Sequence, residues 1–408
     1  MRLFIISALI ILAQANLLNA QQILSPERFE KVDEQVSTIK KEFIFQPQLL
    51  SKKLTDGFTN DYDKVRAFYI WIATNIAYDL DAFNQNKHDG QSIHEVLASG
   101  KALCLGYSLL FDYFCENAGI TCEVIDGYAK GLGYTKNQAF TASNHAWNAV
   151  YLDGNWHLLD VTWANGDPQN GSAHQKRTTL DAYFLVPAEV FILTHLPEDP
   201  SWQLLDQKVT LDEFESGEKT SNSETTKINP YSPEDYIGLN EFDVELLMCK
   251  RASRFNPKNF ILFEHLSFAY VYQAISITDG IYKIPFNTLQ DTLGVIDSMF
   301  SSFLDSASMT IEPVESWKIS SFKTKLKDEI NYQKGVFNYE IGAEFFRKGQ
   351  SQKDLMTEIN EKTSSYFDLA AIHFTQVPNN SIYHESAGEY LANIEHYRQR
   401  EFKYFSPN

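Results

Sequence analysis

The sequence feature that most constrains the fold is a tight-turn signal, Asp153-Gly154, between two runs of residues typical of β-strands, 145–152 and 155–162. Asp-Gly is strongly favoured in two-residue hairpin loops because both positions adopt a positive φ angle. The sequence therefore predicts an antiparallel hairpin with these two residues as its turn. Such a short turn also fixes the register, so paired positions can be counted outward from it.

The predicted register decides which polar residues of the hairpin share a face. Side chains alternate between the two faces of a strand, so the count puts His145 and Asp160 on one face, one diagonal step apart. Trp147 is on the same face, where it either walls a substrate cleft or packs in the core. His157 falls on the opposite face. The register therefore selects His145, and not His157, as the partner of Asp160.

A cysteine precedes the hairpin at the start of a predicted helix. The apolar residues within 105–117 recur with the spacing of a largely buried helix, and Gly119 follows where a C-terminal glycine is expected. Cys104 is then in the first turn, where unpaired N–H groups and the positive end of the helix dipole favour a thiolate. A thiolate, a histidine base and an aspartate that orients the base together form a nucleophilic triad. We therefore expect Cys104, His145 and Asp160 to act together.

Other kinds of site find less support in the sequence. The cysteine spacings do not fit a zinc site, and no acidic loop has the spacing of calcium ligands, so we predict no metal or other cofactor. A formal net charge of −18 argues against nucleic acid as a partner. Cys115 and Cys122 are predicted to be packed residues, with a disulfide between them as the alternative. His195 is predicted to be a loop histidine.

Three ordered motifs resemble the transglutaminase-like superfamily, a branch of the papain-like fold: GKALCLGYSLLF around Cys104, GITCEVIDGYAKG, and NHAWNAVYLDGNWHLLDVTW around His145 and Asp160. Further on, AYFLVPAEVFILTHLPEDPSWQLL, at 182–205, resembles the kyphoscoliosis-peptidase-like branch. The resemblance spans roughly residues 60–215. It implies an α+β fold in which an antiparallel sheet packs on the helix that carries the cysteine. It also implies the same triad of Cys104, His145 and Asp160.

Composition divides the chain into four segments. Residues 1–20 have the positive start, apolar run and small residues of an export signal, so we expect a periplasmic or secreted protein without a stable membrane anchor once the signal is removed. A transglutaminase-like domain is expected at 21–215, and a polar linker rich in Ser and Thr at 216–230. Residues 231–408 show helical periodicity and few strand signals, which predicts an all-helical domain.

Helical periodicity also predicts individual elements. In the N-terminal domain it indicates helices at 25–56 and 61–75 and a short helix capped by Ser92. In the C-terminal domain, 332–347 and 363–378 resemble the two helices of a tetratricopeptide repeat. Because the 34-residue period of such repeats is not cleanly repeated, a plain helical bundle is the alternative.

The chemistry predicted from these residues is acyl transfer from an amide or peptide bond through an acyl-enzyme on Cys104. Release by water would make the chain a peptidase or amidase, and release by an amine would make it a cross-linking transglutaminase. We favour hydrolysis. A catalytically silent protein-binding module is the alternative from a different class, and the complete triad argues against it. The expected partners are a protein or peptide substrate and a protein bound by the helical domain.

Overall fold

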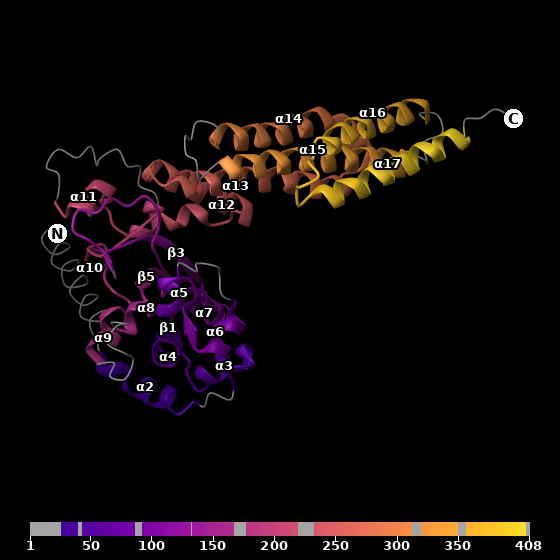
Figure 1. The fold of residues 1–408 in the computed structure, drawn as a ribbon. Coiled ribbons are helices and arrows are strands. Elements are labelled where there is room, and N and C mark those ends of the chain that lie inside the picture. The colour runs from indigo at the N-terminus through magenta and orange to yellow at the C-terminus, as the bar shows by residue number, and fades with distance from the viewer. Residues whose placement is uncertain are drawn as a thin grey trace, which may run out of the picture. The chain divides into compact units, whose positions relative to one another are not determined.

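The structure, a computed structural model, divides into two compact units, Met1–Asp235 and Tyr236–Asn408 (Figure 1). It describes residues 26–39, 43–85, 92–131, 133–166, 177–218, 232–311, 320–349 and 356–404. The expected export signal at 1–20 and residues 219–230 of the expected linker lie outside the described residues.

Helices make up the N-terminal part of the first unit. They are η1 Pro26–Phe29, α2 Glu30–Ser37, α3 Pro47–Leu54, α4 Asp61–Asn75, α5 Leu80–Asn84, α6 Ile93–Ser99 and α7 Cys104–Asn117. The prediction of one helix over 25–56 is wrong, because α2 ends at Ser37 and α3 begins at Pro47. Proline lacks the N–H that a helix interior needs and is favourable at the first helical position. The helices predicted at 61–75 and after Ser92 are confirmed.

The main sheet of the first unit has four antiparallel strands in the order β5-β4-β3-β6. They are β3 Cys122–Ala129, β4 His145–Leu152, β5 Asn155–Leu159 and β6 His195–Pro197, and a separate parallel pair is formed by β1 Ala77–Tyr78 and β2 Lys101–Ala102. The predicted hairpin register is confirmed, because Leu152 pairs with Asn155. Asp153 and Gly154 form the turn with φ angles of 49° and 83°.

The hairpin ends earlier than the sequence predicts. Strand β5 stops at Leu159, and Asp160 becomes the N-cap of a short helix, α8 Val161–Ala164. Its side chain accepts a hydrogen bond from the backbone N–H of Trp163, as a capping aspartate does. The prediction that the strand continues to 162 is therefore wrong. The remaining helices of the unit are α9 Arg177–Ala182, α10 Ala188–Phe191, η5 Pro200–Gln203 and α11 Leu211–Ser216.

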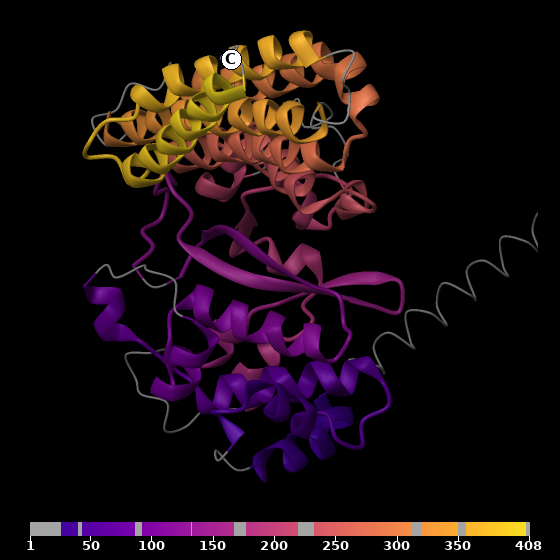
Figure 2. The same cartoon turned by 90° about the vertical axis from the view of Figure 1, so that its right-hand side faces the viewer.

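Helix α7 is held in place by contacts with both the helices and the sheet. It contacts β3 and β4, whose long strands lie across the helices of the same unit (Figure 2). It also contacts α4, where the Phe114 ring of α7 lies 5.4 Å from Phe68 and 6.0 Å from Trp71. These side chains are fully buried. The α+β arrangement predicted from the sequence, with an antiparallel sheet packed on the helix that carries Cys104, is confirmed.

The second unit is helical in the part that the structure describes, and its long helices lie side by side (Figure 2). The short η7 Pro233–Tyr236 spans the unit boundary, and after it come α12 Glu241–Phe255, α13 Phe260–Gly280, η8 Ile281–Lys283, α14 Phe286–Ile311, α15 Ser320–Gly349, α16 Met356–Thr375 and α17 His384–Tyr404. A tetratricopeptide repeat fits two helices into about 34 residues. Helix α15 alone has 30 residues, so these helices have the lengths of a plain bundle.

One helical stretch of the described residues, Phe260–Lys283, is long and apolar enough to cross a membrane, with a mean hydropathy of 1.3. Length and composition alone are weak evidence, because the core helix of a soluble protein passes the same test. Helix α13, which makes up most of this stretch, contacts α12, α14 and α15.

Candidate active site

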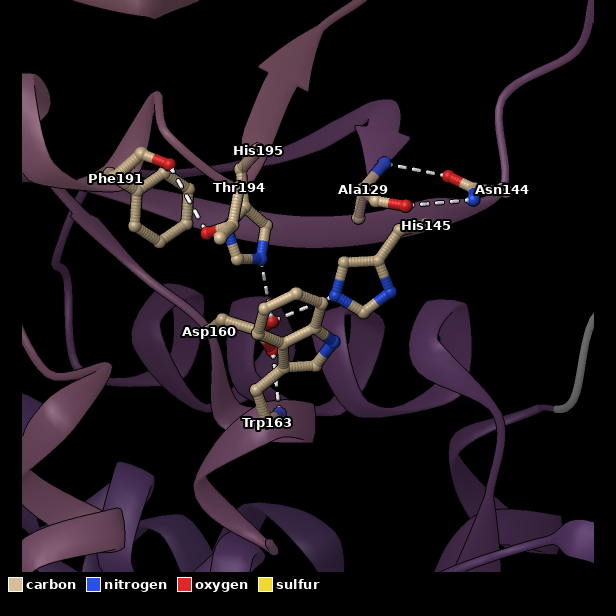
Figure 3. A network of polar contacts seen from close by, with 8 residues as sticks. All are labelled: Ala129, Asn144, His145, Asp160, Trp163, Phe191, Thr194 and His195. Atoms are coloured by element: carbon tan, nitrogen blue, oxygen red, sulfur yellow. Dashed lines mark hydrogen bonds and ion pairs between the residues drawn. The ribbon is translucent and has the colours of Figure 1, made fainter. Parts of the chain in front are cut away.

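The carboxylate of Asp160 is the centre of a buried hydrogen-bond network (Figure 3). Its Oδ2 accepts hydrogen bonds from Nε2 of His145 at 2.7 Å and from Nε2 of His195 at 3.1 Å. Its Oδ1 accepts a hydrogen bond from the backbone N–H of Trp163 at 3.0 Å. A fully buried carboxylate is costly unless its oxygens are hydrogen-bonded. These three donors therefore account for the ionised side chain at this position.

His145 opens β4 at a point where the chain is closely fixed. It pairs with Gly127 of β3. The preceding side chain, Asn144, donates from Nδ2 to the carbonyl of Ala129 at 3.0 Å and accepts from its N–H at 2.7 Å (Figure 3). Position 127 requires glycine, because a Cβ there would lie 2.3 Å from the ring of Trp147. The backbone on both sides of this pairing thus sets the direction of the His145 ring.

Cys104 is the first residue of α7, and its side chain is partly exposed. It forms a side-chain hydrogen bond with His145, whose other partner is Asp160. Helix α7 begins after Leu103 without a side-chain cap, whereas α4, α6 and α8 each have one. The first N–H groups of a helix have no partner within it. Because no side chain caps this turn, its backbone N–H groups lie beside the thiol, where a substrate oxygen would become negatively charged.

The charges of the network follow from burial and from the neighbouring groups. Burial acts against the imidazolium, but Asp160 and Cys104 outweigh it and raise the pKa of His145 to about 10. Burial also acts against the carboxylate, yet His145 and His195 hold the pKa of Asp160 well below its usual range. Burial lowers the pKa of His195 despite its bond to Asp160. At neutral pH, His145 is therefore charged, Asp160 is ionised and His195 is neutral.

The sequence analysis missed His195, which it assigns to a loop. The structure places it on β6, fully buried and bonded to Asp160. A strand of three residues that ends in Pro197 has no readable periodicity, and its pairing with β3 joins distant parts of the chain. The one sequence signal was its position inside the motif at 182–205. His157, which the register rejects, lies elsewhere, with its ring 6.0 Å from that of Tyr62.

Aromatic rings enclose the two imidazoles. The ring of Trp163 lies 5.5 Å from His145 and 4.3 Å from His195, and the ring of Trp147 lies 5.2 Å from His195. Phe191 stacks on His195 at 4.1 Å. Trp147 is 1% exposed, so it packs in the core behind the histidines and does not wall a substrate cleft. Low polarity around the network strengthens its hydrogen bonds.

His145, Asp160 and His195 are also a group whose donor atoms could hold a metal ion, since these atoms lie within 4.8 Å of one another. Both Nε2 atoms, however, hydrogen-bond to the same carboxylate oxygen. A metal ion would have to replace both protons in a fully buried position. The arrangement is that of a hydrogen-bond network linked to a thiol.

The family model of the transglutaminase-like superfamily matches residues 48–161. This segment contains Cys104, His145 and Asp160, and the sheet and helix that hold them have the fold expected of the family. The chain therefore carries a transglutaminase-like domain.

The known relatives point to a branch of this superfamily. The chain is 36% identical to the kyphoscoliosis peptidase of Homo sapiens over 194 residues, which are 47% of this chain and 29% of that protein. This likeness supports the kyphoscoliosis-peptidase-like branch. The chain is also 29% identical to cytokinesis protein 3 of Schizosaccharomyces pombe over 183 residues, 43% of this chain and 20% of that protein. It spans less than a third of the length of either relative.

A solved structure described as that of a TGase is also similar. It shares 24% sequence identity and covers 37% of this chain and 36% of its own, with a TM-score of 0.22. A TM-score this low does not support a comparison of sites.

Proposed function

We propose that the transglutaminase-like domain is a thiol enzyme in which Cys104 attacks the carbonyl carbon of an amide bond. The observation that supports this most is the position of His145, bonded on one side to the Cys104 thiol and on the other to the buried carboxylate of Asp160. His145 already carries the proton in a thiolate–imidazolium pair, and it gives this proton to the leaving amine. Asp160 holds the ring in place and stabilises its charged form. The raised pKa of His145 favours the thiolate–imidazolium pair before substrate arrives.

The tetrahedral intermediate would be stabilised by the N-terminus of α7. Preorganised backbone N–H groups are effective donors to a developing oxyanion. The first turn of α7 carries Cys104 itself and begins without a side-chain cap. Gly106, two residues further on, adds no side chain beside the sulfur.

Hydrolysis of a protein or peptide substrate by an exported protein is the more specific form of the proposal. Water releases the acyl group from Cys104 in a peptidase or amidase, and an amine releases it in a transglutaminase. The apolar run within residues 1–20 supports export to the periplasm or beyond. The helical unit is proposed to bind a protein partner, which its exposed apolar side chains on α14 support: Val295, Met299 and Met309.

A catalytically silent binding module is less well supported. Burying a carboxylate and two imidazoles costs stability, and a packed apolar core would serve a silent module better. The network also reaches a partly exposed thiol at a helix terminus, which a silent module does not need.

Trapping of the acyl-enzyme tests the proposal. The purified protein is incubated with p-nitrophenyl acetate, and its intact mass is followed with and without a primary amine. We expect one acetyl group on Cys104 that is lost to water, and no adduct in Cys104→Ala. Faster loss with transfer to the amine would make the enzyme a transferase, and loss that the amine does not change would make it a hydrolase. Absence of a Cys104 adduct in the wild-type protein would contradict the proposal.

A further inference from the structure

Asp160 binds a second imidazole that the proposed thiol chemistry does not use. Nε2 of His145 and Nε2 of His195 both lie within hydrogen-bond distance of the same oxygen, at 2.7 and 3.1 Å. An ionised carboxylate only accepts hydrogen bonds, so each Nε2 carries a proton. The two ring centroids are 5.5 Å apart, and the rings approach Asp160 from different sides (Figure 3). Two converging donors restrict the position of the oxygen more than one donor would.

One strand places both histidines. Strand β3 has β4 on one side and β6 on the other. Its Gly127 pairs with His145 of β4, and its Ala129 pairs with His195 of β6. Positions 127 and 129 have the same orientation on the strand, which brings the two imidazoles to the same face of the sheet. The convergence on Asp160 therefore results from the sheet register.

Apolar burial surrounds the rest of the His195 ring and lowers its pKa. Its Nδ1 lies 2.9 Å from the hydroxyl of Thr194, which is itself 3.5 Å from the carbonyl oxygen of Phe191. The Thr194 hydroxyl therefore holds the side of the ring that faces away from Asp160. The ring is fully buried and stacks on Phe191, with an interplanar angle of 20°. The titratable groups that face it are Asp160, His145 and Tyr183, whose ring is 6.2 Å away.

We propose that His195 is a positioning residue, a neutral imidazole that fixes the ionised Asp160 so that one carboxylate oxygen faces His145. Its ring nitrogens face Asp160 and Thr194, so it does not act as the base. Its consequence for catalysis depends on the proposed thiol chemistry. Without this donor the buried carboxylate is harder to ionise, so the Asp160–His145 ion pair breaks at a less acidic pH. Cys104 then loses its charged partner under conditions where the wild-type protein keeps it.

The test compares variants that separate the donor from the ring. His195→Phe keeps the ring and removes the donor, whereas His195→Gln keeps an amide donor near the position of Nε2. His157→Phe, on the opposite face of the hairpin, is the matched control. For each protein, the rate of Cys104 alkylation by iodoacetamide is measured against pH. The acid limb of this profile reports the coupled ionisation of Cys104, His145 and Asp160.

We expect the acid limb to move to higher pH by about one unit in His195→Phe, the size expected for one lost hydrogen bond to a charged group. His195→Gln is expected to recover most of this shift, and His157→Phe is expected to match the wild-type protein. A wild-type profile in His195→Phe, or equal shifts in His195→Phe and His195→Gln, would overturn the proposal.

Two further measurements test the role of His195 separately from the proposed thiol chemistry of Cys104. If wild-type Cys104 is not alkylated, thiol chemistry fails, and ¹⁵N NMR titration of the His145 ring still tests His195. The acid-side transition of His145 is expected at higher pH in His195→Phe, and an unchanged transition would overturn the proposal. If His195→Phe does not fold, Thr194→Val removes the hydroxyl that lies 2.9 Å from Nδ1 and holds the ring. It is expected to give a smaller shift in the same direction, and no shift would overturn the proposal.

Discussion

Two ionic clusters are buried in the first unit, and they differ in what their charges can do. In the first, the guanidinium of Arg66, 1% exposed, donates to Asp33 at 2.9 and 2.8 Å and to Asp181 at 2.6 Å. Burial acts against its charge, but the two aspartates outweigh it and raise the pKa of Arg66 further. The guanidinium at its centre is permanently charged, and the cluster joins α2, α4 and α9.

The second cluster is built from groups that can change charge. Asp160 holds two imidazoles, and one of them reaches a partly exposed thiol. An imidazole, unlike a guanidinium, gains and loses a proton under conditions a protein survives. The comparison shows that burial and pairing alone do not identify a functional site. What sets the second cluster apart is an imidazole that bonds both to a buried carboxylate and to a partly exposed thiol.

The largest effect is expected from Asp160→Asn. The amide cannot accept from both imidazoles in the same way and no longer stabilises charged His145, so acyl transfer should fall about 10³- to 10⁴-fold. Asparagine still caps α8, so the free energy of unfolding should change less than activity does. Single-turnover acylation and chemical denaturation measure the two quantities. Activity within tenfold of the wild-type protein would remove Asp160 from the mechanism.

Arg66→Met should have the opposite pattern. It removes a buried cation from two aspartates that stay partly exposed, and the free energy of unfolding should fall by about 3 kcal/mol. The acylation rate of the folded fraction should stay within about twofold, because Arg66 bonds to Asp33 and Asp181 and not to Asp160 or His145. Urea denaturation checks the first quantity. A large loss of activity in protein that is still folded would show that the two clusters are coupled.

Of the two clusters, the second should contribute the larger pH dependence of stability between pH 6 and 10. The pKa of His145 is raised to about 10 from an unfolded value of about 6.5, so its contribution is complete below pH 6.5 and is lost as pH rises through 10. Asp160, whose pKa is lowered, contributes above its unfolded value and loses its contribution only in strong acid. Denaturation between pH 6 and 10 should show this slope in Arg66→Met, and His145→Gln should flatten it. An equal slope in His145→Gln would contradict the assignment.

The smallest effect is expected from His157→Gln. This histidine belongs to neither cluster, and its ring packs beside Tyr62. The free energy of unfolding should fall by about 1 kcal/mol or less, and acylation should be unchanged. A loss of activity comparable to that of Asp160→Asn would contradict the assignment of the catalytic residues to the face that His145 shares with Asp160.

Local signals predicted the parts of the site that depend on local geometry. The Asp153-Gly154 turn set the register, and the register joined His145 to Asp160. The start of α7 at Cys104 follows from apolar spacing within one helix. Each of these predictions needed only neighbouring residues or a single two-residue turn.

The predictions failed where two local signals conflict or where a residue is placed by pairing with a distant part of the chain. Asp160 fits a strand by alternation, but its side chain caps the next helix and ends the strand. Pro47 breaks an otherwise periodic helical run. His195 reaches the site only because three residues of β6 pair with β3, and no local pattern encodes that pairing.

The most direct measurement is the rate of iodoacetamide alkylation at each cysteine at about pH 5 to 6, where an ordinary thiol of pKa about 8.5 is almost unreactive. Mass spectrometry locates the adduct in the wild-type protein and in His145→Ala, and Cys115, Cys122 and Cys249 serve as internal references. If Cys104 is a nucleophile paired with His145, it should react at least about tenfold faster than these three, and the difference should disappear in His145→Ala. Slow alkylation of Cys104, or equally fast alkylation in His145→Ala, would contradict an activated thiol at this site.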